Sequence, residues 1–159
     1  MRQTEPLVLA VDCGTQSLRA LILDKKGKIL AQEAVVYQPP YFSTQPGYAE
    51  QNPDFYYDRL CQAVGALKEN HAAAFGRVQA LVLTTMRDSV LCLDRGKKPL
   101  TPCILWLDER LAECKRPMPF PYRAIFRIGG MSDCAAYSRE HSTCNWISQN
   151  RPEIWEKTD

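Results

Sequence analysis

The sequence predicts an α/β domain built around a mixed β-sheet, and three observations support that prediction. Two short apolar runs, residues 7–11 and 18–23, lie near the N-terminus and are separated by a small polar loop, as in a pair of strands. A long amphipathic helix is predicted from residue 52 onward, and a third apolar run over 78–84 follows it. Hairpins combined with alternating strands and helices are typical of a mixed sheet in an α/β domain.

Each element in the first half of the chain has a local reason. The runs LVLAV and LRALIL are rich in Val and Leu, and the turn DKKG leads into a third strand over 28–37. Several prolines and a glycine make 38–51 a loop. Asn52 is then the N-cap of the helix, and Pro53 is its first residue. The inward stripe of this helix is formed by Tyr56, Leu60, Val64 and Leu67.

The second half of the chain is less regular. Residues 78–84 are predicted to form the clearest buried strand after the first, and 90–93 a strand of a second hairpin. The turn of that hairpin, DRGKK, repeats the chemistry of DKKGK at 24–28. No structure is predicted for 118–130, which is Pro-rich and then basic and aromatic. The other predictions are a short strand at 104–107, a helix over 108–115, a helix over 138–150 with Trp146 and Ile147 inward, and a further helix from 153.

Composition and charge argue against several classes of protein. A net charge of +2 over 159 residues argues against a nucleic-acid partner bound through a basic surface. No apolar run approaches the ~20 residues that span a bilayer, and the N-terminus does not resemble a signal peptide, so no membrane partner is expected. Seven cysteines without C-x-x-C spacing, several inside apolar runs, predict reduced, mostly buried thiols and a cytoplasmic protein.

Two polar clusters, residues 12–17 and 84–88, follow predicted strands, where ligands bind in open α/β sheets. One cluster could hold a phosphate donor and the other an acceptor. The first cluster has two interpretations. In a phosphate cradle, Asp12 holds the water shell of Mg²⁺, Gly14 admits an anion close to the backbone, Thr15 and Ser17 donate hydrogen bonds, and Arg19 reaches the anion. In a plain hairpin tip, Asp12 and Ser17 only cap backbone amides.

Four segments of the chain, taken in order, resemble the FGGY carbohydrate kinases. DCGTQSLRALILDKKGKIL resembles the D-x-G-T opening loop of that family, and PGYAEQNP resembles the segment before its first long helix. TTMRDSVLCLDRGKKPLTPCILWLDER is similar to its substrate-reading turn, hairpin and W-x-D-x-R segment, and NWISQNRPEIW to its W-I…P-E-I stretch. Any one of these motifs is weak, but four in order over almost the whole chain are specific.

The resemblance implies an actin-like or ribonuclease H-like mixed sheet with flanking helices, and ATP and a sugar bound in a cleft between two such domains. It implies that Asp12 positions Mg²⁺. The residues that would face the ATP phosphates are Gly14, Thr15, Gln16, Ser17 and Arg19. The residues that would form the site for a sugar or polyol are Met86, Arg87, Asp88, Trp106, Asp108 and Tyr137.

The site residues depart from the family pattern in informative ways. Arg87 and Asp88 match the Arg-Glu pair with which glycerol kinases hold polyol hydroxyls, whereas xylulose kinases favour Q-M-H-G at 85–88. Trp106 would cover the carbon skeleton of the acceptor, and Tyr137 matches only loosely, because its spacing to Trp146 is off by one. The alternative is that Arg87 and Asp88 form a surface pair and that Trp106 belongs to the core.

The family's general base and its adenosine site match nothing within the 159 residues. The chain is therefore expected to be the N-terminal, sugar-binding part of a kinase domain, truncated within its first domain, lacking the second ATPase domain and inactive alone. An incomplete sheet is also expected to self-associate, giving a possible homo-oligomer. The other hypothesis is a non-catalytic regulatory module of the same fold that binds a sugar or a nucleotide.

Overall fold

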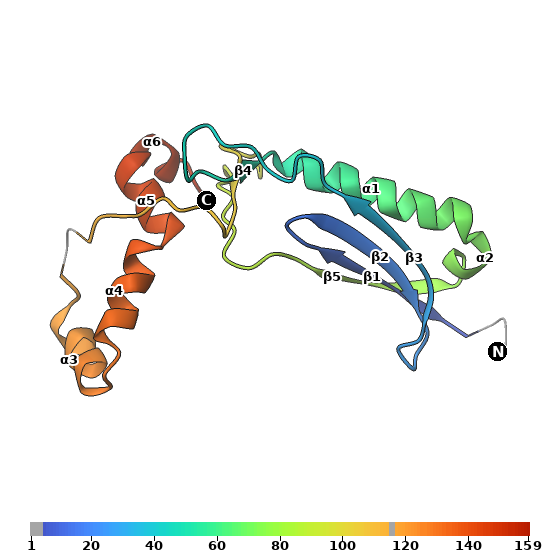
Figure 1. Ribbon diagram of the computed structural model, residues 1–159, viewed down its shortest axis with the longest axis horizontal. Helices are drawn as coiled ribbons and strands as arrows, with labels where there is room; N and C mark the ends of the chain where they lie inside the picture. The colour runs from blue at the N-terminus through green and yellow to red at the C-terminus, as the bar shows by residue number, and fades with distance from the viewer. Residues whose placement is uncertain (1–4, 115–116) are drawn as a thin grey trace. The chain divides into compact units, whose positions relative to one another are not determined.

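The computed structural model describes residues 5–114 and 117–159, and the chain divides into two compact units (Figure 1). The first unit holds the residues up to Phe42 together with Gln51–Asp88. The second unit holds Ser43–Glu50 and Ser89–Asp159. Each unit has its own buried cluster, so each is described by itself.

The first unit contains a four-stranded sheet in the order β3-β2-β1-β5. Its strands are β1 (Leu7–Cys13), β2 (Ser17–Leu23), β3 (Ile29–Val36) and β5 (Val78–Thr84). β2 pairs antiparallel with both β1 and β3, whereas β5 pairs parallel with β1. The predicted mixed sheet and its three N-terminal strands are therefore confirmed.

Helix α1 (Pro53–Asn70) covers one face of this sheet by packing on β2 and β3 (Figure 1). The helix begins as predicted, because the Asn52 side chain accepts a hydrogen bond of 3.0 Å from the backbone N–H of Asp54. Leu67 is fully buried, and the rest of the predicted stripe packs against the same core. Buried residues alternate along β1 and β2, namely Leu7, Leu9 and Val11, then Leu18, Ala20 and Ile22, which is the pattern of a sheet with one covered face. The short helix α2 (Ala72–Phe75) follows α1.

Strand β5 lies where the sequence predicts a strand, but the prediction that it is buried is wrong. Leu81, Val82 and Leu83 are 62%, 52% and 51% exposed. The physical reason is the position of the strand, because β5 is the edge of the sheet that the structure describes and α1 packs over β2 and β3. An apolar sequence predicts a strand that prefers burial, but it does not say what covers that strand.

The two turns with matching chemistry also have matching geometry. In each turn the aspartate side chain accepts the N–H four residues on, from Lys28 to Asp24 at 3.0 Å and from Lys98 to Asp94 at 2.9 Å. In each turn the aspartate N–H also donates to that lysine's carbonyl, at 3.0 Å and 2.9 Å respectively. The predicted strand over 90–93 is reduced to isolated bridges, one of which joins Val90 to Ile104.

The second unit consists mainly of turns and short helices. β4 (Glu50–Gln51), at the boundary of the units, pairs with β6 (Cys103–Ile104). The helices are α3 (Phe120–Ile128), α4 (Ser132–Glu140), α5 (Thr143–Asn150) and α6 (Pro152–Trp155). Its core is formed by Cys92, Ile104 and Ile147, with Trp146 packed against them, so the predicted inward direction of Ile147 and Trp146 is confirmed.

Two helix predictions in the second unit need correction. Residues 108–114 are not helical, because their polar groups bond to other segments: Ala112 N–H donates to Glu140 O at 2.7 Å, and Glu113 N–H to Gln149 Oε1 at 2.8 Å. Residue 115, the end of that predicted helix, lies outside the described residues. The predicted helix over 138–150 is interrupted before Thr143, where Ser142 caps α5 and its hydroxyl accepts the N–H of Asn145 at 3.3 Å.

The cysteines are free thiols, as predicted, but most of them are not buried. Cys92 and Cys103 are buried and Cys13 is partly buried. The exposed ones are Cys61, Cys114, Cys134 and Cys144. Apolar neighbours in the sequence therefore overestimated burial. Within the described parts of the chain, no helix is both long enough and apolar enough to cross a membrane.

Candidate functional site

The two predicted polar clusters meet at one edge of the sheet in the first unit. Asp12 near the end of β1 lies opposite Thr84 at the end of β5 in the parallel pair. The Thr84 hydroxyl donates to Asp12 Oδ1 at 3.1 Å, and Nη1 of Arg19 lies 3.9 Å from Asp12 Oδ2. Arg19 faces Asp12 because β1 and β2 pair in that register. The carboxyl ends of parallel strands share an edge, which is why residues 72 positions apart are neighbours.

This edge is open to solvent. The side chains of Asp12 and Arg19 are 55% and 63% exposed, so their mutual attraction is weak and both remain available to a ligand. No group of three or more potential metal ligands from His, Cys, Asp and Glu occurs in the described part of the chain. A single open carboxylate fits Mg²⁺ held largely through its own water molecules, since Mg²⁺ usually keeps several waters and uses one or two carboxylates.

The loop between β1 and β2 is tightly closed. Gly14 N–H donates to Ser17 O at 3.0 Å, and a Cβ placed on Gly14 would lie only 3.1 Å from that same oxygen. Gln16 O accepts the N–H of Tyr37 at 2.9 Å, which ties the loop to the end of β3. Glycine is therefore favoured at position 14, because a Cβ would crowd the loop's own backbone.

Cys13, the other candidate for chemistry in this loop, is a packed thiol. Its Sγ lies 3.7 Å from the hydroxyl of Tyr37. Burial raises the pKa of Cys13, and the nearby Asp12 charge raises it further, although the bond to Tyr37 acts in the opposite direction. The thiol therefore stays protonated at neutral pH, which favours the interpretation of Cys13 as a passive loop residue.

The predicted acceptor turn follows Thr84 directly. Met86 is partly buried, whereas Arg87 and Asp88 are exposed. Asp88 has a φ of 57°, in the left-handed region where aspartate is one of the few tolerated side chains. Only Thr85 and Met86 separate Arg87 from Thr84, the residue that bonds to Asp12.

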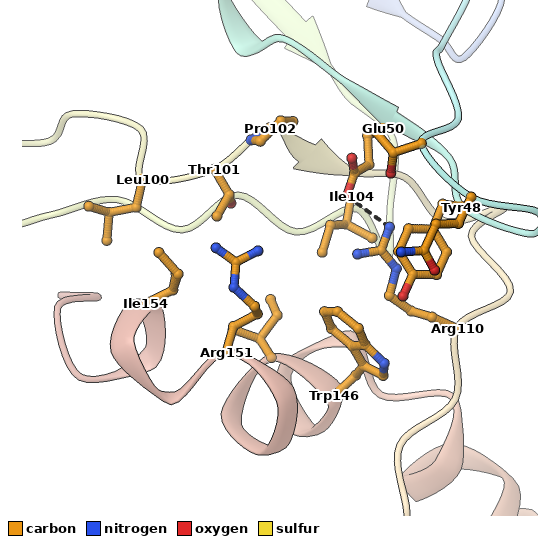
Figure 2. Close-up of a pocket in the computed structure, with 13 residues that line it drawn as sticks. Tyr48, Glu50, Leu100, Thr101, Pro102, Ile104, Arg110, Trp146, Arg151 and Ile154 are labelled. Carbon is orange, nitrogen blue, oxygen red and sulfur yellow. Dashed lines mark hydrogen bonds and ion pairs between the residues drawn. The ribbon is translucent and has the colours of Figure 1, made fainter.

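The second unit contains a buried charged cluster that the sequence did not reveal as such (Figure 2). Arg110 donates from Nε to Asp108 Oδ1 at 2.6 Å, from Nη2 to Asp108 Oδ2 at 2.7 Å, and from Nη2 to Glu50 Oε1 at 2.9 Å. Its guanidinium carbon lies 3.7 Å from the ring centre of Tyr48 and 4.7 Å from that of Trp146. We call these five residues the Arg110 cluster.

The ion pair at the centre of the Arg110 cluster is buried. The side chains of Arg110 and Asp108 are 4% and 2% exposed. Burial opposes the charge on Arg110, but the hydrogen bonds to Asp108 and Glu50 outweigh it and raise the pKa of Arg110 above its usual range. The signal in the sequence was the pairing of two motifs, since Glu50 belongs to PGYAEQNP and Arg110 ends W-x-D-x-R.

A cavity of about 430 Å³ lies beside the Arg110 cluster (Figure 2). Figure 2 shows Leu100, Ile104 and Ile154 as apolar wall, with Thr101 and the guanidinium of Arg151 beside them. Arg151 donates to Glu153 at 2.6 Å, so its charge is already paired on one side. None of the predicted site residues lines this cavity.

The remaining predicted site residues also lie in the second unit, so the prediction is divided between the two units. Trp106 is 59% exposed, which excludes the alternative that it is a core side chain. Its backbone N–H donates to the hydroxyl of Ser89 at 3.2 Å. Tyr137 is exposed and stacks on His141 with ring centres 3.7 Å apart. Asp108 has a carboxylate already occupied by protein donors.

The mixed sheet with flanking helices is the actin-like or ribonuclease H-like fold that the resemblance implied, and solved structures show the same fold. A xyloylose kinase from Brucella ovis matches with a TM-score of 0.74 and 22% identity, covering 96% of this chain and 31% of that chain. A xylulose kinase from Lactobacillus acidophilus matches with a TM-score of 0.71 and 17% identity, covering 96% and 30%.

The sequence itself gives the family. The model of the N-terminal domain of the FGGY family of carbohydrate kinases matches residues 7–159, and the chain therefore belongs to that family. A glycerol kinase from Thermococcus gammatolerans is 29% identical over 156 residues, which are 98% of this chain and 31% of the relative. An apulose kinase from Pectobacterium atrosepticum is 37% identical over 107 residues, 66% of this chain and 21% of the relative. The chain thus spans less than a third of the length of these curated relatives.

Proposed function

We propose that this chain forms the N-terminal, sugar-binding part of a kinase that transfers the γ-phosphoryl group of ATP to a hydroxyl of a sugar or polyol. The observation that carries the proposal is Asp12, an open carboxylate beside Thr84 at the shared edge of two parallel strands in an FGGY domain. Phosphoryl transfer depends mainly on positioning and on charge neutralisation, and an open acid at a strand end is suited to both.

The phosphate donor is assigned to the edge formed by β1 and β2. Asp12 would hold Mg²⁺ there, and the ion would supply charge neutralisation for the phosphates when bound with ATP. Arg19 lies on the neighbouring strand within 4 Å of Asp12, close enough to contact the same anion. The loop residues assigned to the phosphates are Thr15, Gln16 and Ser17 as donors, and Gly14, whose N–H donates to Ser17 O, as the residue that admits the anion close to the backbone.

The acceptor is assigned to the exposed polar and aromatic side chains after β5. Arg87 donates hydrogen bonds to acceptor hydroxyls and Asp88 accepts them, while the face of Trp106 covers C–H groups. Met86 and Tyr137 complete this set. Asp108, in contrast, is given a supporting role, because both of its oxygens already accept hydrogen bonds from the protein.

A coupled ADP-release assay tests the proposal. In the longest reading frame that contains this chain, glycerol, xylulose, ribulose or erythritol should stimulate ADP release, and Asp12→Asn should reduce turnover at least ~100-fold by weakening metal positioning. Asp58→Asn, an exposed aspartate on α1, is the matched control and should keep full activity. Full activity in Asp12→Asn would remove Asp12 from the mechanism.

Residues 1–159 alone are proposed to be inactive, because phosphoryl transfer needs donor and acceptor walls that close around the reacting groups. Acceptor-dependent ADP release by this chain at about 1 s⁻¹ or faster would contradict that. If the longest reading frame binds an acceptor but releases no ADP, the regulatory-module hypothesis replaces the kinase. Light scattering tests self-association, which the exposed apolar side chains of β5 favour.

A further inference from the structure

We propose that Arg110 is a positioning residue that fixes the turn carrying Trp106. This inference rests on the proposed function, in which the face of Trp106 contacts the acceptor. Trp106 is exposed, whereas the residues that hold its turn, Leu105 and Asp108, are almost completely buried. The aromatic ring of Trp106 is therefore exposed, whereas the side chains at the two ends of its turn are buried.

The two ends of this turn both form hydrogen bonds with one residue, Ala49. The turn is closed by Asp108 N–H, which donates to Leu105 O at 3.0 Å. Leu105 N–H donates to Ala49 O at 3.0 Å, and Asp108 Oδ2 accepts the N–H of Ala49 at 2.7 Å. Both backbone groups of Ala49 are thereby satisfied by the two ends of the Trp106 turn, so the turn can shift only by breaking a buried bond.

Arg110 fixes the carboxylate of Asp108, which bonds to Ala49. Asp108 Oδ1 accepts the Arg110 N–H at 3.0 Å and its Nε at 2.6 Å, and Oδ2 accepts Nη2 at 2.7 Å. A guanidinium is planar and binds a carboxylate with two parallel bonds, which fixes direction as well as distance. Without this partner, a buried carboxylate would have to rotate toward water or take up a proton.

Arg110 is itself held against rotation. Glu50 Oε1 accepts its Nη2 at 2.9 Å, and the rings of Tyr48 and Trp146 pack against the guanidinium. Tyr48 and Glu50 flank Ala49 in the chain. The residues that hold Arg110 are therefore adjacent to the residue that bonds to the Trp106 turn. Packing and ion pairing of this kind set the direction of a side chain within a narrow range.

One further bond holds this turn within the second unit. Ser89 Oγ accepts the N–H of Trp106 at 3.2 Å. The position of Trp106 is thus tied to Ser89 as well as to Ala49. Loss of Arg110 should therefore be read out at Trp106, which lies in the turn that Asp108 closes.

Fluorine NMR of the chain labelled with 5-fluorotryptophan tests the proposal directly. The chain has three tryptophans, Trp106, Trp146 and Trp155, and their resonances are assigned by single replacements with Phe. Arg110→Met should shift and broaden the Trp106 signal as well as that of Trp146, whereas Arg110→Lys, which keeps the charge but not the planar pair of bonds, should restore the Trp106 position only in part. Arg151→Met, an arginine of the same unit outside the Arg110 cluster, is the control and should leave Trp106 unchanged.

The outcome at Trp106 separates a positioning role from a merely structural one. If only Trp146 moves in Arg110→Met, while Trp106 keeps its wild-type shift and width, the proposal is wrong. If Arg110→Met does not fold, Glu50→Ala decides, because it removes the acceptor of the Arg110 Nη2 bond and leaves the Asp108 pair in place. It should displace Trp106 in the same direction by a smaller amount, and an unmoved Trp106 in that variant would overturn the proposal.

Acceptor titrations separate this inference from the proposed function. Addition of glycerol or xylulose to the wild type should shift Trp106 if it contacts the acceptor. In the active reading frame, Arg110→Met should raise the acceptor KM roughly tenfold with a smaller effect on the ATP KM, since displacement by ~1 Å can cost up to ~100-fold. No acceptor shift in the wild type would contradict the role of Trp106 in the proposed function, while a Trp106 displaced by Arg110→Met would still support the positioning role.

Discussion

Two aspartates of this chain, Asp12 and Asp108, both stand in motifs that the FGGY resemblance assigns to ligands, yet their surroundings are opposite. Asp12 lies in the first unit, its side chain is 55% exposed, and among the described residues it accepts a side-chain hydrogen bond from Thr84 alone. Asp108 lies in the second unit, is 2% exposed and accepts four, from Ala49 and Arg110. A carboxylate has about four acceptor positions, so Asp108 is saturated whereas Asp12 is not.

This difference in burial and pairing distinguishes a carboxylate that can bind a ligand from one that stabilises the fold. An open carboxylate costs little to leave unpaired, because water solvates it until a ligand replaces that water. A buried carboxylate must be fully paired, and its pairing holds other parts of the chain in place. The same residue type in two motifs therefore serves two purposes, and the number of protein donors tells them apart.

The largest expected effect is on stability, when each aspartate is replaced by alanine. Asp108→Ala should lower the free energy of unfolding of the second unit by about 3–5 kcal/mol, because it leaves Arg110 buried without its main partner. Asp12→Ala should change the stability of the first unit by no more than about 0.5 kcal/mol. Urea unfolding is followed by tryptophan fluorescence, which reports on the second unit since it holds all three tryptophans, and by amide exchange of β2 for the first unit. Equal losses in the two variants would remove the distinction.

A smaller effect is expected where open side chains bind a ligand. Arg87→Ala or Asp88→Ala in the active reading frame should weaken acceptor binding by about 1–3 kcal/mol, because a partner in the acceptor loses its hydrogen bond. The affinity for ATP should hardly change. Arg87→Ala should also keep its stability because the side chain is exposed, whereas Asp88→Ala adds a small backbone cost, since alanine tolerates the left-handed φ of 57° less well than aspartate. The measurement is a pair of calorimetric titrations, with acceptor and with ATP. A variant that loses ATP but keeps the acceptor would reverse the assignment of the two subsites.

A third aspartate extends the comparison to pH. Hydrogen bonds from the backbone N–H groups of Lys28 and Lys26 lower the pKa of Asp24 below its ordinary value of 3.8, although partial burial opposes this. The group therefore contributes stability that is fully present above its unfolded pKa and is lost as pH falls through the lower folded pKa. Asp24→Asn should flatten the acid loss of stability of the first unit below about pH 4. The unfolding midpoint of the first unit in urea, followed by amide exchange in β2, is measured at a series of pH values from 7 to 2. An unchanged dependence of that midpoint on pH in Asp24→Asn would contradict the stabilising role of the Asp24 charge.

Local chemistry was predictable from the sequence, whereas coverage and distant pairing were not. The cap at Asn52, the two aspartate turns and strands β1 to β3 follow from near neighbours in the chain, and their prediction is confirmed. The burial of β5 was wrong because no local pattern says which elements a helix will cover. The helix expected from residue 108 was wrong because Asp108 bonds to Ala49, 59 residues away.

The candidate site divides in the same way between local and distant pairing. Asp12 and Thr84 could be expected at one sheet edge because a parallel pairing rule connects strand ends. The Arg110 cluster joins Tyr48 and Glu50 to the W-x-D-x-R segment, and nothing in the spacing of the two motifs predicts that pairing. In the sequence, Glu50 and Arg110 are only two charged residues in separate segments, and nothing local shows that they form a buried ion pair.

The smallest expected effect compares the two aspartate turns, one in each unit. Gly27 and Lys97 occupy the same position, with φ of 78° and 62°. A Cβ at Gly27 would meet nothing within 4 Å, so Gly27→Ala should cost only the left-handed backbone penalty, offset by the restricted unfolded chain, about 0.5–1 kcal/mol net.

Lys97 already carries this penalty, and its exposed ion pair with Asp159 at 2.8 Å offsets it only partly. Lys97→Ala removes the ion pair and keeps the penalty, whereas Lys97→Gly removes both. The difference in unfolding free energy between these two variants should therefore match the cost of Gly27→Ala, about 0.5–1 kcal/mol in favour of glycine. Tryptophan fluorescence in urea measures the second unit and amide exchange in β2 the first. The two turns have the same hydrogen bonds, so the difference in unfolding free energy between glycine and alanine should be equal in both. Unequal differences would mean that contacts outside the turns, and not the shared backbone geometry, determine the cost of alanine.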